Sequence, residues 1–167
     1  DSCTEENTAG KDYSFVAYYT EIGYGLIEVQ HWEGSTNYLV DMKTGKETDI
    51  IGYPTLSPDK KRIAVENADL ESGYTDNVLS VYEIRPDGLV AEFIEKPKEW
   101  APVNLRWINN QEITFVQRRI NPNWENRTEK TFFVETPKKL IHRNAKSRDT
   151  AKWSIKGNEE RNEEGRP

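Results

Sequence analysis

YPTLSPDKKRIAV, residues Tyr53–Val65, is the stretch that decides the fold class of this chain. Two short apolar runs enclose a turn in which Pro58 fixes the backbone φ angle. Ser57 and Asp59 can accept hydrogen bonds from nearby backbone amides there. Because the strands on both sides of such a turn pair with each other, the stretch predicts a β-hairpin.

The hairpin pattern occurs a second time, in NLRWINNQEITFV, residues Asn104–Val116. Asn109 and Asn110 tolerate the left-handed backbone conformation, so we expect them to take the tight-turn positions of this copy. The copies are about 50 residues apart, a period typical of repeated β-sheet units. Together with strand-like segments that begin at Tyr13, they predict three units.

Each unit is expected to be an antiparallel meander, because apolar residues alternate or cluster in fives between Gly, Pro and Asn turns. The first unit is the least regular and lacks a clear outer or inner strand. In the third unit we expect strands at residues 103–107, 112–119, 130–135 and 139–142, with a turn at 136–138. No segment of helical length has a period of 3.6 residues, so the chain is predicted to be all-β.

These units predict one domain at residues 13–143, preceded by a disordered segment at 1–12. Residues 144–167 are expected to form a loosely docked segment that ends in a disordered tail. The expected core consists of alternating large apolar side chains. They are Leu56, Ile63, Val65, Val81, Trp107, Ile113, Phe115 and Phe133.

Cysteine, histidine and charge content exclude several kinds of function. One cysteine, Cys3, cannot form an internal disulfide, and two distant histidines give no metal-ligand spacing, so we expect no metal and no cofactor. Residues 1–137 carry a net charge of −10 and residues 138–167 carry +4. An acidic body disfavours nucleic acid and favours a basic protein partner, although it could also serve solubility alone.

The N-terminal residues give a weak indication of location. No apolar segment approaches the length of a membrane span, and the sequence has no initiator Met, so we expect a precursor whose leader has been removed. Cys3 is a candidate lipid anchor, with an ordinary free cysteine as the alternative.

The Asn67–Asn77 loop, NADLESGYTDN, is the leading candidate for a binding site. It is longer than the roughly two to five residues of a hairpin turn, and Leu70 and Tyr74 would gain nothing from exposure to water alone. Binding a partner is favoured over packing on the same domain and over a mobile filler. The candidate partner-binding residues are Asp69, Leu70, Glu71, Ser72, Gly73, Tyr74, Thr75, Asp76 and Trp124.

Trp124 lies in a second expected loop, INPNWENRTEK. It is either a binding hot spot or a side chain that covers a hairpin core. With Trp32 and Trp100 it could also form an aromatic platform for a carbohydrate or peptidoglycan, which is the alternative to protein binding.

Catalysis is less favoured by the sequence. Carboxylate pairs such as Glu92 with Glu95, or Asp69 with Glu71, could serve a glycosidase, but in a chain with 31% charged residues such pairs arise by chance. No nucleophile elbow or phosphate-binding loop is present. We therefore expect a non-catalytic protein.

The run LSPDKKRIAV followed by NVLSVYEIRPDGLV resembles the blade signature of bacterial propeller repeats of the WD40-like, TolB-type class. In that class Ser-Pro-Asp-Gly-Lys precedes an inner strand, and Lys60 stands here in place of Gly. Closed propellers hold about four to eight blades. Three units therefore imply an open or three-bladed miniature propeller-like fold, or assembly with a partner.

The segment GYPTLSPDKKRIAVENADLESGYTDNVLSVYE, residues Gly52–Glu83, is also similar to periplasmic immunity proteins that neutralise peptidoglycan amidase effectors of type VI secretion. In that family a serine-containing hairpin loop plugs the Cys-His cleft of the effector, and Ser72 would be that serine. Members often hold more cysteines than this chain. The resemblance implies a periplasmic inhibitor of a basic hydrolase, a cell-wall amidase.

Overall fold

The structure, a computed structural model, describes residues 12–31, 34–124, 132–143 and 153–157. Across these residues the chain forms strands and no α-helix. The strands make three four-stranded antiparallel sheets, each a meander. The predicted all-β, propeller-like fold of four-stranded meanders is therefore confirmed.

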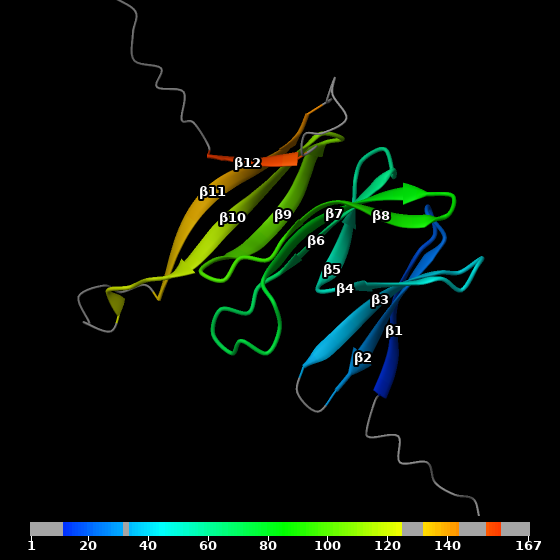
Figure 1. Cartoon of the computed structure of the whole chain (residues 1–167), viewed down its shortest axis with the longest axis horizontal. Coiled ribbons are helices and arrows are strands. Elements are labelled where there is room, and N and C mark those ends of the chain that lie inside the picture. Colours follow the sequence, from blue (N-terminus) through cyan, green and yellow to red (C-terminus); the bar gives the residue numbers. More distant parts are fainter. Residues whose placement is uncertain (1–11, 32–33, 125–131, 144–152, 158–167) are drawn as a thin grey trace, which may run out of the picture.

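The three sheets follow one another along the sequence (Figure 1). The first sheet consists of β1 (Asp12–Tyr19), β2 (Tyr24–Gln30), β3 (Ser35–Asp41) and β4 (Glu47–Ile50). The central sheet consists of β5 (Tyr53–Leu56), β6 (Arg62–Asn67), β7 (Val78–Arg85) and β8 (Gly88–Glu95). The third sheet consists of β9 (Ala101–Asn109), β10 (Glu112–Ile120), β11 (Phe133–His142) and β12 (Trp153–Gly157).

The central sheet is buried on both faces. On β6, Ile63 and Val65 belong to a cluster shared with the first sheet, whereas Ala64 belongs to a cluster shared with the third sheet. Because successive side chains of a strand point to opposite faces, a strand covered on both sides needs a continuous apolar run. This explains why Ile63, Ala64 and Val65 are consecutive.

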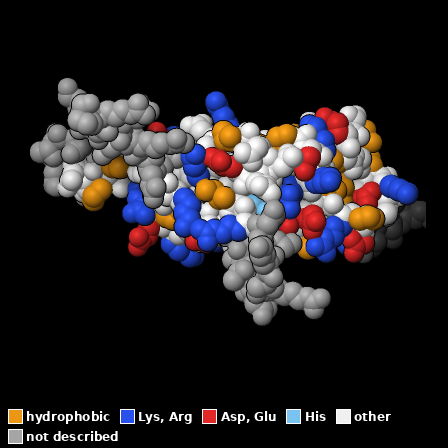
Figure 2. Space-filling model, turned by 90° about the horizontal axis from the view of Figure 1, so that it is seen from above, with side chains coloured by type: hydrophobic (Ala, Val, Ile, Leu, Met, Phe, Trp, Pro, Cys, Tyr) orange, Lys and Arg blue, Asp and Glu red, His pale blue; other side chains and the backbone are white. Residues whose placement is uncertain are grey.

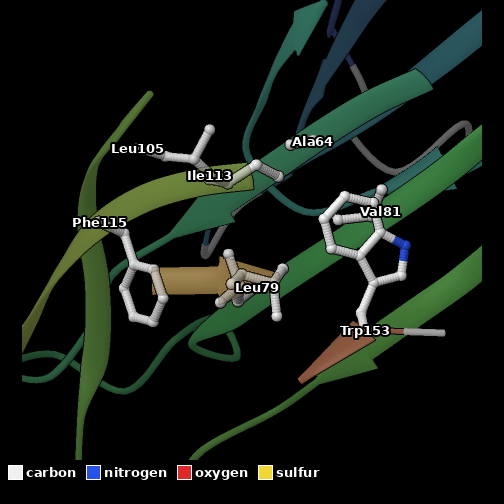
Figure 3. Close-up of a cluster of buried hydrophobic side chains, with 8 residues drawn as sticks. Ala64, Leu79, Val81, Leu105, Ile113, Phe115 and Trp153 are labelled. Carbon is white, nitrogen blue, oxygen red and sulfur yellow. The ribbon is translucent and has the colours of Figure 1, made fainter. Parts of the chain in front are cut away.

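The cluster between the central and third sheets contains the largest buried side chains (Figure 3). Trp153 extends from β12 toward Val81 on β7 and is only 2% exposed. Of the predicted core residues, Ile63, Val65, Val81, Ile113 and Phe115 are buried, while Leu56 and Trp107 are partly buried against the two clusters. Phe133 is in neither cluster; its ring faces Phe132 and the Arg118 guanidinium.

The β5–β6 turn has the hydrogen bonds that its sequence predicts. The Ser57 hydroxyl donates to Asp59 at 2.7 Å and accepts the Arg62 amide at 3.0 Å, and Asp59 accepts the Lys61 amide at 3.1 Å. Lys60 has φ of 60°, the conformation for which the propeller signature uses glycine.

The prediction that Asn109 and Asn110 adopt the left-handed conformation is wrong. Among the described residues other than glycine, only Lys60 and Asn104 have positive φ. Asn109 ends β9, and its side chain instead accepts the amide of Gln111 at 2.8 Å. A side-chain hydrogen bond thus supports the turn, where asparagines in the left-handed conformation were expected.

The predicted end of the third sheet is also wrong. Residues 136–138 form no turn, since β11 is continuous and Pro137 lies opposite Val116 of β10. The fourth strand is β12, whose pairing with β11 begins at Lys138 opposite Gly157. Pro137 is thus just beyond the β12 pairing, where a strand tolerates a residue without an N–H.

The prediction of a loosely docked tail is therefore wrong for residues 153–157, which form a strand of the third sheet. The other residues of the predicted tail, and the predicted N-terminal segment up to residue 11, lie outside the described residues. Asp12 already belongs to β1. The first sheet, expected to lack a clear strand, has four.

Corresponding strands of successive sheets lie beside each other. Among first strands, the Tyr19 hydroxyl donates to the Pro54 carbonyl at 3.3 Å and the Trp107 indole donates to the Thr55 carbonyl at 3.0 Å. Among fourth strands, the Trp153 indole of β12 donates to Glu92 of β8 at 3.1 Å. The sheets therefore stack in the same orientation, first strand on first strand.

Candidate functional site

The Asn67–Asn77 loop joins β6 to β7 and extends away from the central sheet (Figure 1). It contains eight of the nine predicted site residues, from Asp69 to Asp76. The ninth, Trp124, follows β10 in the third sheet. The structure thus keeps the two parts of the predicted site on different sheets.

The Asp69 carboxylate organises the loop from inside. Its Oδ1 accepts the amides of Ser72 at 3.1 Å and Gly73 at 3.0 Å, together with the Ser72 hydroxyl. Its Oδ2 accepts the Thr75 amide at 2.9 Å and the Thr75 hydroxyl at 3.2 Å. One side chain therefore satisfies five donors across the turn, which lets a loop without strand pairing keep one conformation.

These bonds also fix the charge state of Asp69. The Ser72 hydroxyl first, and then the amides of Thr75, Gly73 and Ser72, hold the pKa of Asp69 well below its ordinary value, although partial burial opposes them. The carboxylate is ionised at neutral pH, and its charge is directed into the loop rather than outward.

Two asparagines close the base of the loop. The Asn77 side-chain oxygen accepts the Asp69 amide at 2.8 Å, and Asn67 donates to the Asp76 carbonyl at 2.8 Å and to the Thr75 hydroxyl at 2.9 Å. Asn77 is buried and donates to the Pro97 carbonyl at 3.3 Å. So many hydrogen bonds argue against a mobile loop, which was one of the alternatives that the sequence left open.

The outward-facing residues of the loop differ from those that hold it together. Tyr74 is 68% exposed, whereas Leu70 is half-buried. Asp76 pairs with Lys96 at 3.0 Å, so Glu71 is the exposed acid of the loop whose charge is directed to solvent. Ser72 donates its hydroxyl hydrogen to Asp69, which leaves its oxygen able to accept a bond from a partner.

A hollow of about 390 Å³ lies between the loop and the first sheet. Gly73, Tyr74, Thr75 and Asp76 line one side, and His31, Gly34, Ser35, Thr36 and Ile51 line the other. His31 is hydrogen-bonded to the Thr36 hydroxyl at 3.1 Å. No local sequence pattern points to this second wall, because its residues lie far from the loop in the sequence.

Trp124 was expected to be either an exposed binding hot spot or a side chain that covers a hairpin core, and it has features of both. Its ring meets the Phe132 ring edge-on at 4.8 Å, yet 42% of its surface is exposed. Trp100 is instead stacked on Phe115 at 6.0 Å beside the core. Trp32 lies outside the described residues, so of the proposed aromatic platform only Trp124 is both described and exposed.

One carboxylate of each pair considered for catalysis has protein partners. Asp69 is held by its own loop, and Glu92, with a side chain 2% exposed, binds Arg62 and Trp153. Within the described ranges, no group of three His, Cys, Asp or Glu side chains could hold a metal ion. The same residues include no helix long and apolar enough to cross a membrane. Cys3 lies outside them.

Acidic, basic and apolar side chains are interspersed on the visible face of the molecule (Figure 2). No protein-family model, curated protein or solved structure matches the chain.

Proposed function

We propose that this chain is a non-catalytic binding protein that inhibits a partner enzyme by inserting the Asn67–Asn77 loop into its active cleft. The observation that carries the proposal is a preformed loop that presents an exposed aromatic side chain. Five hydrogen bonds to Asp69 fix the backbone while Tyr74 is 68% exposed. A rigid loop loses little conformational entropy on binding, so its contacts translate more fully into affinity.

The partner that fits this loop best is a basic hydrolase. Glu71 gives the tip an outward negative charge, and the body of the chain is acidic. Such charges accelerate encounter with a cationic cleft rim, while a buried aromatic side chain supplies most of the affinity. Together with the similarity of residues 52–83 to immunity proteins, this favours a cell-wall amidase as the partner and the periplasm as the location.

The loop geometry assigns different roles to its residues in this proposal. Tyr74 is the anchor that fills the cleft, and the Ser72-Gly73 tip approaches the catalytic groups through the Ser72 oxygen. Asp69 acts indirectly, because its carboxylate is used inside the loop. Substitution of Asp69 should therefore weaken binding by loosening the loop and not by removing a contact.

The test is binding to the purified hydrolase encoded beside this chain, measured by calorimetry and by inhibition of peptidoglycan cleavage. Tyr74→Ala should weaken binding by on the order of 30-fold or more, as expected for a central aromatic anchor. Tyr53→Ala is the matched control, since Tyr53 is similarly exposed but lies on β5. Equal affinity after replacing the loop with a two-residue turn would contradict the plug.

Charge and tip substitutions separate steering from fit. Glu71→Lys should mainly slow association and reduce its salt dependence, whereas Ser72→Arg should misfit the cleft and raise Kd by on the order of 100-fold. If no neighbouring hydrolase binds, the alternative is a carbohydrate- or peptidoglycan-binding module that uses Trp124. Soluble peptidoglycan fragments, with Trp124→Ala as the variant, test that alternative.

A further inference from the structure

The outer face of the first sheet, which points away from the central sheet, is apolar at β1 and acidic at β4. Two cross-strand rows define it. The first row is Phe15, Ile27, Tyr38 and Asp49, and the second is Tyr18, Gly25, Val40 and Glu47. Both rows begin with an aromatic side chain and end with a carboxylate.

This face is open to solvent at its β1 and β4 edges and partly buried at its centre. Tyr13 is 70% exposed and Phe15 is 64% exposed, and Tyr18 and Met42 are also exposed. A hollow of about 170 Å³ lies among Tyr13, Ile27, Val29, Tyr38, Val40 and Glu47. Exposed apolar surface of this kind, with a recess that one side chain can fill, is typical of an interaction surface.

The outer face of the third sheet is different in character. Its central row, across all four strands, is Arg106, Thr114, Lys139 and Lys156. A fourth cation, Arg118, lies two residues beyond Val116 on the same face of β10. Arg118 pairs with Glu135 and Lys139 pairs with Glu112, both at 2.7 Å, which leaves Arg106 and Lys156 as the exposed cations at the two ends of the row. Basic side chains thus extend from the first strand of this sheet to its fourth.

The stacking rule within the chain says how these two faces would meet. First strands adjoin through Tyr19 with Pro54 and through Trp107 with Thr55, and fourth strands adjoin through Trp153 with Glu92. If the third sheet of another copy followed the same rule, its β9 would lie on β1 and its β12 on β4. Arg106 would then face the aromatic side chains of β1, and Lys156 would face Asp49 and Glu47.

We propose that the outer face of the first sheet binds the outer face of the third sheet of a second copy of this chain. Both ends of the match are complementary, since Arg106 can form a cation–π contact with Phe15 or Tyr13 and Lys156 can pair with the β4 carboxylates. The two faces of each copy differ, so the contact is heterologous. If two copies make this contact twice, each first sheet against the other copy's third sheet, the three sheets of each copy close into one ring. The number of sheets in that ring is within the range of about four to eight found in closed propellers.

This inference is independent of the proposed inhibitor function, because the Asn67–Asn77 loop belongs to the central sheet and to neither outer face. The partner of the apolar face is a second copy of this chain and not the hydrolase. Loss of self-association and loss of hydrolase binding are therefore separable results.

The test is sedimentation velocity of the full chain over a range of concentrations, with two charge-reversed variants. The first carries Glu47→Lys and Asp49→Lys, and the second carries Arg106→Glu and Lys156→Glu; all four side chains are exposed, so folding should survive. Each variant alone should weaken self-association by on the order of tenfold or more. The chain with all four substitutions, or an equimolar mixture of the two variants, should recover the part of the association that residue 156 makes with residues 47 and 49, whereas the cation–π contact of Arg106 stays lost.

The aromatic end of the face has its own variant. Phe15→Glu should abolish association, whereas Ile94→Glu, at an exposed apolar position on β8, should leave it unchanged. Circular dichroism melting curves establish that each variant is folded.

A wild-type chain that is monomeric at every concentration would overturn the proposal and leave the face to another segment or partner. A dimer that is insensitive to Arg106→Glu with Lys156→Glu would overturn it as well, since an association of two first sheets would not use those cations. An oligomer larger than a dimer that still needs both charge sets would support the contact and contradict closure after two copies.

Discussion

Glu66 on β6 accepts the backbone N–H of Leu105 on β9 with both carboxylate oxygens, at 3.0 Å each. A β-bulge makes this possible, because two residues of β9, Asn104 and Leu105, lie opposite Phe115 alone. Asn104 has φ of 60°, and the bulge turns the next N–H away from β10. A side chain of the central sheet thus replaces the lost backbone pairing of the third sheet.

The bulge predicts a pH dependence of stability. Burial raises the pKa of Glu66, and the Leu105 amide opposes that effect only in part. Because the folded-state value is above the unfolded one, ionisation costs stability: the free energy of unfolding falls as the pH rises from about 4 toward the folded-state pKa and stays lower above it. Glu66→Gln keeps an acceptor for Leu105 and removes this titration.

The free energy of unfolding of Glu66→Gln, relative to that of the wild type, should therefore be higher at pH 7 than at pH 4. Urea unfolding of both proteins at the two pH values measures the difference. A stability difference that is the same at both would contradict the assignment.

The Asp69 network predicts the order of the binding loop. Asp69→Asn removes the charge and part of the acceptor capacity, so hydrogen exchange at the amides of Ser72, Gly73 and Thr75 should accelerate by on the order of tenfold. In the wild type the pKa of Asp69 is lowered by folding, so the order should be complete above about pH 4 and be lost as the pH falls through the folded-state value. Asp76→Asn, which removes only a surface pair with Lys96, is the control and should leave these amides protected.

The buried ion pair between the central and third sheets predicts a large loss of stability. Arg62 Nε lies 2.7 Å from Glu92 Oε2, and the two side chains are 16% and 2% exposed. Glu92→Ala leaves a mostly buried guanidinium and the Trp153 indole N–H without this acceptor, so the free energy of unfolding should fall by about 3 to 5 kcal/mol.

Glu83→Ala is the control for that experiment, because Glu83 also pairs with an arginine, Arg85, but at the surface. Its cost should be below about 1 kcal/mol. Equal losses in the two variants, measured by chemical denaturation, would show that burial of the Glu92 pair has no energetic consequence.

Lys60 predicts a stabilising substitution. A side chain at φ of 60° is strained by about 1 to 2 kcal/mol, part of which glycine recovers in spite of its greater freedom in the unfolded chain. Lys60→Gly should raise the free energy of unfolding by up to about 1 kcal/mol. Lys61→Gly is the control, because φ is not positive there, and it should lower the free energy of unfolding. If Lys60→Gly is less stable than the wild type in the same thermal melts, the backbone of Lys60 is not strained.

Local sequence accounts for the strands, the turns and the position of the loop. The Ser57 hydroxyl bonds Asp59 and the Arg62 amide, both within five residues, so the bonds that close the SPDKK hairpin are encoded locally. The Asp69 carboxylate likewise binds partners no farther than Thr75. The alternating and continuous apolar runs give the all-β class, because their period depends only on strand geometry.

Tertiary structure decided how strands are grouped and which residues meet. The segment at Trp153 looked like a tail because it is short and polar, and it becomes a strand only because β11 provides an edge and Glu92, 61 residues earlier, accepts its indole N–H. Pro137 looked like a turn, and it continues a strand because β12 pairs only from Lys138 onward. The second wall of the hollow at Tyr74 and the stacking of first strand on first strand also join residues that no local pattern connects. Sequence by itself fixes the hydrogen bonds that close within a few residues, whereas packing between sheets depends on surfaces that exist only after each sheet has formed.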